Sequence, residues 1–298
     1  MPGSDFNRIV ATSRPAFLIL TPCCLLVAVA FAFAEKIGIY YSSIVLVFIG
    51  ALASHISVNM FNEYEDFTSG LDLHTRRTAF SGGSGTLPMA PELANSVWLG
   101  AVISLAITVV IGFYFLWLRG WELLPIGILG VLSVYFYTTK ITHSPLLCLI
   151  VPGLAFGPLM INGAYYALSG QYSPAVFSTS LIVFFLVNNL LLLNQFPDRE
   201  ADKNAGRCHL PILIGGKKSA WVYAAFSVAA YVILVADVLL AYLPFYSLIG
   251  LLSLFLAIPA AVMAVCYFDD IEKLKIALAL NVAVTLSTPV LVAIGIVL

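Results

Sequence analysis

Nine long apolar segments make up most of this chain, and each is close to or above the roughly 20 residues that an α-helix needs to cross a bilayer. Hydrophobic residues form 61% of the sequence and charged residues only 10%, a balance that excludes an ordinary soluble domain. We therefore predict an all-α integral membrane protein, one domain over residues 1–298, with about nine transmembrane helices bundled around a cavity. The segments run over residues 15–34, 37–62, 93–117, 121–139, 145–168, 174–196, 219–242, 245–268 and 274–298.

Positive charge is distributed unevenly between the two ends of these segments. If successive segments alternate in direction, twelve of the 14 lysines and arginines lie on the side of the N-terminus, and only Lys36 and Arg119 lie on the other side. Loops rich in lysine and arginine remain in the cytoplasm. We therefore expect a cytoplasmic N-terminus and a cavity that opens to the cytoplasm.

The second apolar segment runs directly into an acidic cluster that begins at Asn62. If the helix continues through the cluster, Asn62 and Asp66 share one face, because they are four residues apart. Gly70 then allows the backbone to turn, so that Asp72 can approach from the loop. Such oxygen ligands suit Mg²⁺, which takes one or two carboxylates and completes its shell with water and phosphate oxygens. For a single cluster, a solvated helix end is an alternative interpretation.

A second acidic cluster follows the sixth apolar segment and has the same arrangement. Asn194 begins it, and Asp198 and Asp202 follow at helical spacing. Two acidic clusters that face each other across a membrane protein repel each other unless cations lie between them. We therefore predict that Mg²⁺ ions join the clusters to a diphosphate. The predicted ligands are Asn62, Asp66, Asp72, Asp198 and Asp202.

The two clusters resemble the aspartate-rich motifs of the UbiA superfamily of intramembrane aromatic prenyltransferases. Asp72 lies six residues beyond Asp66, a spacing that resembles the naphthoate (menaquinone) branch of that family. The Phe-Ser-Gly-Gly-Ser run at 80–84 and the Phe-Gly-Pro run at 156–158 also resemble that branch. Glu63 departs from the pattern, since the family usually has Asp at this position.

The resemblance implies a Mg²⁺-dependent transfer of a polyprenyl group from polyprenyl diphosphate to an aromatic acceptor, expected to be 1,4-dihydroxy-2-naphthoate. The bilayer would accommodate the polyprenyl tail, and neither a nucleic acid nor a protein partner is implied. Catalytic roles are implied for Asp66, Asp198, Asp202 and Tyr137, although a tyrosine at a membrane boundary is more often a belt residue. Polar and basic residues near the clusters are candidates for binding the substrate. They are Arg14, Asn59, Arg76, Arg77, Lys140, Asn194, Arg199 and Lys203.

Two other functions remain open from the sequence. Another branch of the superfamily would use the same site on a hydroxybenzoate, a tetrapyrrole side chain or a glycerol phosphate lipid. A cation-coupled transporter would also need paired acidic residues. Transporter sites lie near the bilayer midplane on broken helices, whereas these carboxylates are expected at the cytoplasmic ends of the helices, which favours the enzyme.

Overall fold

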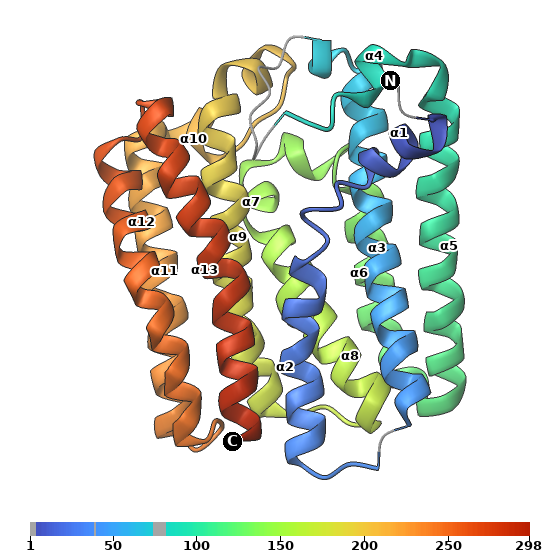
Figure 1. Ribbon diagram of the computed structural model, residues 1–298, viewed down its shortest axis with the longest axis vertical. Coiled ribbons are helices and arrows are strands. Elements are labelled where there is room, and N and C mark those ends of the chain that lie inside the picture. The colour runs from blue at the N-terminus through green and yellow to red at the C-terminus, as the bar shows by residue number, and fades with distance from the viewer. Residues whose placement is uncertain (1–3, 39, 74–81) are drawn as a thin grey trace.

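The computed structural model describes residues 4–38, 40–73 and 82–298, and the regular elements in these ranges are all helical. Long helices run side by side in a bundle, and the two ends of the chain lie at opposite ends of it (Figure 1). The first half contains α1 (Asp5–Thr12), α2 (Leu20–Ala34), α3 (Tyr41–Thr68), the 3₁₀ turn η1 (Leu71–Leu73), α4 (Thr86–Met89), η2 (Pro91–Leu93), α5 (Ala94–Arg119), η3 (Trp121–Leu123) and α6 (Leu124–Phe136). The second half contains η4 (Ile141–His143), α7 (Pro145–Leu154), the π-helical segment η5 (Ala155–Leu159), α8 (Met160–Ser169), α9 (Pro174–Asn204), α10 (Leu210–Ile214), α11 (Gly216–Leu239), η6 (Phe245–Ser253), α12 (Leu254–Cys266) and α13 (Ile271–Val297).

The helices confirm the prediction of an all-α membrane protein with about nine apolar helices. In the described ranges, seven helical stretches are long and apolar enough to cross a membrane. The other two predicted segments form shorter apolar helices, Leu20–Ala34 and Trp121–Phe136. Both helices that carry acidic clusters continue beyond their apolar runs, α3 to Thr68 and α9 to Asn204. The second cluster and the first part of the first cluster are therefore helical extensions, and Asp72 follows in the turn η1.

Helix α9 lies inside the bundle and α5 lies at its edge. Of the residues in the most apolar part of α9, 67% are buried. The corresponding share for the helical stretch that contains α5 is 11%. Large apolar side chains of α5, such as Val110 and Trp117, point outward and are 67% and 82% exposed. An apolar surface of this kind is stable against lipid and costs free energy in water.

Two glycines allow the 145–169 stretch to pack directly against α9. A Cβ on Gly153 would lie 2.2 Å from the carbonyl oxygen of Phe184, and one on Gly157 would lie 2.6 Å from that of Ser180. The Gly153 amide also donates to Asn188 Oδ1 (2.6 Å). Small residues four apart permit this close approach of membrane helices. The contact fixes one wall of the cavity described below against the helix that carries the second acidic cluster.

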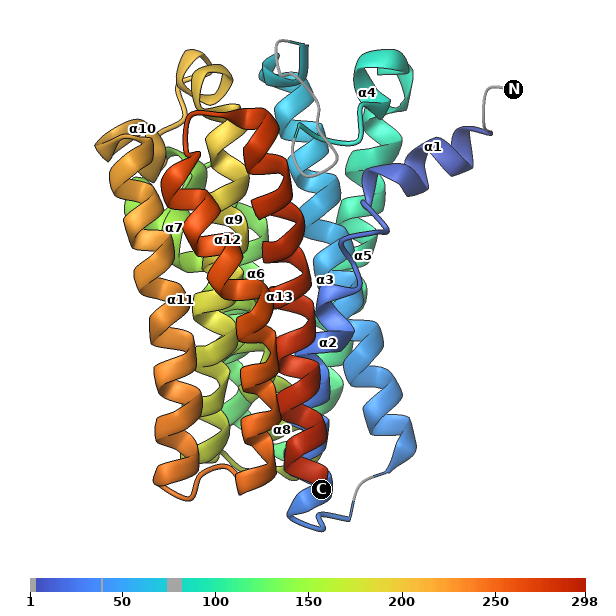
Figure 2. The same ribbon diagram turned by 60° about the vertical axis from the view of Figure 1, so that its left-hand side comes forward.

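The short helix α1 lies outside the bundle, beside α4 at the end where the N-terminus lies (Figure 2). Ser4 caps it by accepting from the Asn7 amide (3.4 Å), and Phe6 and Val10 are exposed. Thr86 at the start of α4 donates to the Arg8 carbonyl (3.4 Å). Helix α1 thus leads the chain across the end of the bundle to Arg14.

Candidate active site

A cavity of about 700 Å³ opens between the helices. Its walls are mostly apolar and come from α2, α3, α5, α6 and the 145–169 stretch, while its polar end lies where α3 and α9 carry their acidic clusters. The predicted site residues Arg14, Asn59, Asn62, Asp66, Asp72, Tyr137, Asn194, Asp198 and Asp202 line this cavity. The two halves of the candidate site, which are far apart in the sequence, therefore meet at one place.

Helix α3 presents one polar face to the cavity. Asn59, Asn62 and Asp66 lie on it, as their spacing predicts. At the end of the helix the backbone turns through Gly70, whose φ of 79° is left-handed and whose amide donates to the Phe67 carbonyl (3.0 Å). This turn brings Asp72, which is 6% exposed, back to the same cavity.

Helix α9 presents Asn194, Asp198 and Asp202, each four residues after the last, to the same space. The helix ends in a Schellman turn at Gly206, which has a φ of 79°. In this turn the Arg207 amide donates to the Asp202 carbonyl (2.9 Å). Arg207 is thereby returned to the side of the helix that carries the second cluster.

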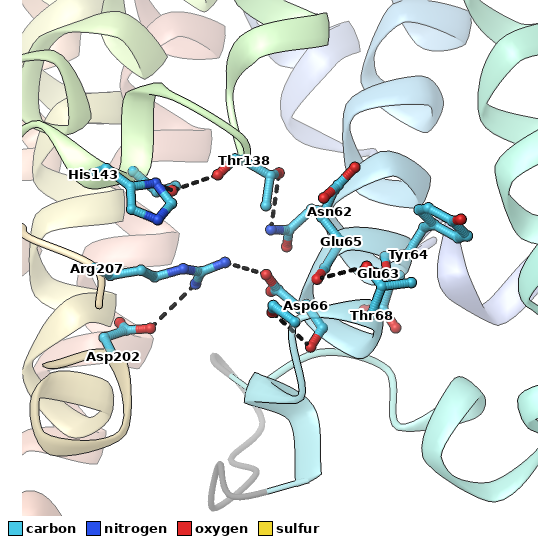
Figure 3. A network of polar contacts seen from close by, with 12 residues as sticks. Asn62, Glu63, Tyr64, Glu65, Asp66, Thr68, Thr138, His143, Asp202 and Arg207 are labelled. Atoms are coloured by element: carbon cyan, nitrogen blue, oxygen red, sulfur yellow. Dashed lines mark hydrogen bonds and ion pairs between the residues drawn. The ribbon is translucent and has the colours of Figure 1, made fainter. Parts of the chain in front are cut away.

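Arg207 joins the two acidic clusters directly. Its guanidinium donates to Asp66 Oδ1 on α3 and, at 3.2 Å, to Asp202 Oδ1 on α9 (Figure 3). The arginine side chain is 15% exposed and each aspartate side chain 9%. Burial lowers the pKa of Arg207, but the Asp66 and Asp202 carboxylates raise it further, so that it lies above the usual arginine value. A permanent positive charge therefore lies between the clusters.

Further hydrogen bonds hold both clusters in place. His209 Nε2 lies 3.1 Å from Asp202 Oδ2. Asn62 Nδ2 donates to Thr138 Oγ1 (3.3 Å), and Asn62 Oδ1 accepts from Arg14 Nη2 (2.9 Å). The loop after α6 that contains Thr138 and Tyr137 therefore closes the polar end of the cavity from a third side (Figure 3).

Several predicted substrate-binding residues lie away from the cavity lining. Lys140 and Lys203 are exposed, and Arg199 pairs with Asp269 (3.4 Å) and Glu200 (3.3 Å) on the outer face. Arg199 and Lys203 each follow a cavity-lining aspartate by one residue, a step of about 100° around a helix, and so they face elsewhere. Arg76 and Arg77 lie outside the described residues. The substrate-binding roles of these five residues stay predictions.

The oxygen ligands of the two clusters suit a hard cation that also binds water or phosphate oxygens. In the described part of the chain, no three His, Cys, Asp or Glu side chains converge closely enough to hold a metal by themselves. Mg²⁺ does not require this, since it usually binds one or two carboxylates and keeps water or phosphate oxygens. Among the described residues, Asn194 Oδ1 is buried without a hydrogen-bond partner, and its side chain lines the cavity. The carboxylates and amide oxygens of both clusters are thus suited to magnesium and a phosphate ligand.

Sequence reasoning did not single out Arg207, His209 or Thr138 as site residues. Gly206 is the signal that could have identified the first, because a glycine just past a helix end predicts a turn that folds the next residue back. Thr138 comes from a different segment, and no local pattern connects it to Asn62.

Comparison with known proteins places this architecture among membrane prenyltransferases. The model of the UbiA prenyltransferase family matches residues 22–282. The chain is 31% identical over 222 residues to the 1,4-dihydroxy-2-naphthoate octaprenyltransferase of Bacillus subtilis (strain 168), covering 73% of this chain and 68% of that protein. It is 22% identical over 243 residues to UbiA prenyltransferase domain-containing protein 1 of Dictyostelium discoideum, covering 78% and 72%.

Solved structures share the fold over nearly the whole chain. The apo structure of a UbiA homolog from Aeropyrum pernix K1 has a TM-score of 0.72 at 19% identity, covering 95% of this chain and 97% of that one. The structure of a UbiA homolog from Archaeoglobus fulgidus bound to GPP and Mg²⁺ has a TM-score of 0.64 at 14% identity, covering 97% and 99%.

Proposed function

This chain belongs to the UbiA prenyltransferase family, and we propose that it transfers a polyprenyl group from polyprenyl diphosphate to 1,4-dihydroxy-2-naphthoate in menaquinone biosynthesis. The observation that carries the proposal is the meeting of two acidic clusters, from α3 and α9, at the polar end of an otherwise apolar cavity. That combination matches the two ends of a polyprenyl diphosphate, which is anionic at one end and hydrocarbon along the rest.

The acidic end is where the diphosphate would bind. Asn62, Asp66 and Asp72 from one side and Asp198 and Asp202 from the other would hold Mg²⁺, which neutralises the diphosphate and so makes it a better leaving group. Arg207 adds a permanent positive charge between the clusters. Its planar guanidinium can turn from a carboxylate to a phosphate oxygen, because both accept the same paired donors.

The apolar part of the cavity would hold the prenyl chain. Side chains from α5 and α6, together with Phe156, line it. Both helices also carry exposed apolar side chains, such as Trp117 and Leu129, which would face the surrounding lipid. We propose that the hydrocarbon tail enters the cavity from the bilayer beside these helices and so avoids crossing water. Exclusion of water matters for the chemistry, since water would trap the allylic cation before the acceptor could.

The reaction breaks the bond between C1 of the prenyl chain and the diphosphate oxygen, and the electron pair leaves with the diphosphate. An electron-rich ring carbon of the acceptor then forms the new carbon–carbon bond, and in the naphthoate case the ring carboxylate leaves as CO₂. Tyr137 lines the cavity next to the acidic end, and its ring face can stabilise the allylic cation.

The naphthoate acceptor is favoured by the 31% identity to the Bacillus subtilis octaprenyltransferase. The resemblance of the Asp66 to Asp72 spacing to the naphthoate branch supports the same choice. We further propose that the polar end of the cavity opens to the cytoplasm, as the distribution of lysine and arginine indicates.

Binding of a radiolabelled prenyl diphosphate to the purified protein in detergent tests the site. We expect binding that needs Mg²⁺, is abolished by EDTA, and falls at least about tenfold in Asp66→Asn and Asp198→Asn, because each loses a charge that faces the metal. Asp269→Asn is the matched control, since Asp269 is an exposed aspartate on the outer face. Metal-independent binding, or equal losses in all three variants, would refute the assignment.

A further inference from the structure

Glu63 belongs to the first acidic cluster but does not line the cavity. It is completely buried, and its carboxylate accepts three hydrogen bonds from the described residues. Oε1 accepts from Arg14 Nε (2.8 Å) and from the Ser84 amide (2.6 Å), and also lies 2.7 Å from Arg14 Nη2, while Oε2 accepts from Ser84 Oγ (2.7 Å). A single carboxylate thus joins three segments: the link after α1, helix α3, and the turn before α4.

The two segments that Glu63 holds both border the polar end of the cavity. Arg14 lines it and has a φ of 52°, a left-handed conformation that is costly for a residue other than glycine and needs support from its surroundings. Asn59 Nδ2 supplies part of that support by donating to the Ser13 carbonyl (2.8 Å). Because Arg14 also donates to Asn62, the plane of its guanidinium is fixed by two partners.

The turn before α4 is pressed against the carboxylates. Gly82 and Gly83 line the cavity, and Gly83 has a φ of 71°. A Cβ on Gly83 would lie 3.2 Å from both Glu63 Oε1 and Asp72 Oδ1, so a side chain there would strain the conformation and crowd both acids. Backbone in such a turn, where it lines the cavity as Gly82 and Gly83 do, is suited to contact an anion.

We propose that Glu63 is a positioning residue for the diphosphate and not a metal ligand. It anchors the Arg14 guanidinium and the Gly82–Ser84 backbone at the polar end of the cavity, where both can contact the diphosphate. The inference rests on the proposed function for the identity of that anion. A metal ion coordinated by Glu63 would break the ion pair with Arg14 and leave the arginine charge without its buried partner, which costs free energy. Glutamate, one methylene longer than aspartate, reaches both anchored segments.

The experiment separates an anchor from a ligand by measuring metal binding without substrate. Glu63→Gln keeps the shape of the side chain and removes its charge. Glu65→Gln is the control, since it removes the same charge from a half-buried residue two positions further along the chain. Asp66→Asn is the comparison variant for loss of a metal ligand. Binding of Mn²⁺ alone is followed by the electron paramagnetic resonance signal of the free ion. Hydrogen exchange over residues 82–86 reports whether the turn is held, and steady-state kinetics give KM for prenyl diphosphate and kcat.

If Glu63 positions Arg14 and the turn before α4, Glu63→Gln should give the following results. The Mn²⁺ Kd stays within about twofold of wild type, whereas Asp66→Asn raises it at least about tenfold. Exchange over 82–86 becomes faster, and KM for prenyl diphosphate rises about tenfold, as expected when one charge-assisted contact is lost, with a smaller change in kcat. Glu65→Gln changes none of these. Ser84→Ala, which removes one of the three donors and keeps the Arg14 pair, gives smaller changes in the same direction and replaces Glu63→Gln if that variant does not fold.

Two outcomes would overturn the inference. One is a loss of Mn²⁺ affinity in Glu63→Gln as large as in Asp66→Asn, which would make Glu63 a ligand. The other is unchanged exchange over 82–86 together with an unchanged KM in both the Glu63 and Ser84 variants. If the wild-type protein bound no prenyl diphosphate, the proposed function would fail instead, and the exchange and Mn²⁺ results would still decide whether Glu63 anchors the turn.

Discussion

Arg207 occupies the space between the acidic clusters, and removing it should make metal binding tighter. The guanidinium of Arg207 bridges Asp66 and Asp202 and so supplies positive charge between the two acidic clusters. A cation that enters the site must compete with it. We therefore predict that Arg207→Gln lowers the Kd for Mn²⁺ or Mg²⁺ measured without substrate, although the variant loses a charge that would help to bind the diphosphate.

The size of the effect follows from the two contacts. A hydrogen bond to a charged group contributes about 1.5 to 3 kcal/mol when it is shielded from water, and here the arginine side chain is 15% exposed and the aspartates 9%. If metal binding breaks one of the two contacts, the lower figure applies, about 1.5 kcal/mol. Because each 1.4 kcal/mol corresponds to a factor of about ten, the Kd should fall about tenfold.

Titration with Mn²⁺ in detergent, followed by the signal of the free ion, measures this directly. Thermal unfolding adds a second readout, in which Arg207→Gln should be less stable than wild type in EDTA and should gain more from added Mg²⁺. Arg199→Gln is the matched control, because it removes an equal charge from an exposed ion pair on α9, the helix that Arg207 follows. The Kd of this variant should change by less than about twofold. An unchanged or higher Kd in Arg207→Gln would refute the competition.

Two further predictions concern the fold and its orientation. Gly157→Ala should destabilise the protein by about 3 kcal/mol, because the added methyl would lie 2.6 and 2.8 Å from backbone atoms of α9. Gly127→Ala is the control and should be neutral or slightly stabilising, because its Cβ meets nothing within 4 Å. Denaturation in detergent compares the two variants, and equal losses of stability would contradict the packing described. In a background without the native cysteines, a membrane-impermeant maleimide should label Glu200→Cys only in inverted vesicles and Lys36→Cys only in intact cells; the reverse pattern would place the polar end of the cavity on the outer side.

Much of the fold and part of the site could be predicted from the sequence because the signals are local. Bilayer-length apolar runs identify the helices, and a spacing of four residues places Asn62 with Asp66, and Asp198 with Asp202, on single helix faces. Gly70 is likewise a local signal for the turn that returns Asp72. All of these residues line one cavity in the structure.

The remaining features depend on contacts between distant segments. In the sequence Glu63 cannot be told apart from the other acidic residues of the first cluster. Its role depends on Arg14 and Ser84, which lie 49 and 21 residues away in the chain. Arg207 reaches Asp66 across 141 residues of sequence. Arg199 and Lys203 lie next to the second cluster in sequence, but their helical positions turn them away from the cavity lining, and their roles in substrate binding stay predictions. Spacing identifies a face of one helix, but it does not identify what that face meets.

The most direct test of the account is prenyl transfer by the purified protein in detergent. Labelled polyprenyl diphosphate and Mg²⁺ are supplied with either 1,4-dihydroxy-2-naphthoate or 4-hydroxybenzoate, and EDTA is added to a parallel sample. We expect a prenylated product with the naphthoate alone. EDTA should abolish it, and Asp198→Asn should reduce it at least about a hundredfold, as expected for loss of a metal-facing carboxylate. A product with hydroxybenzoate alone, or transfer that persists in EDTA, would contradict this expectation.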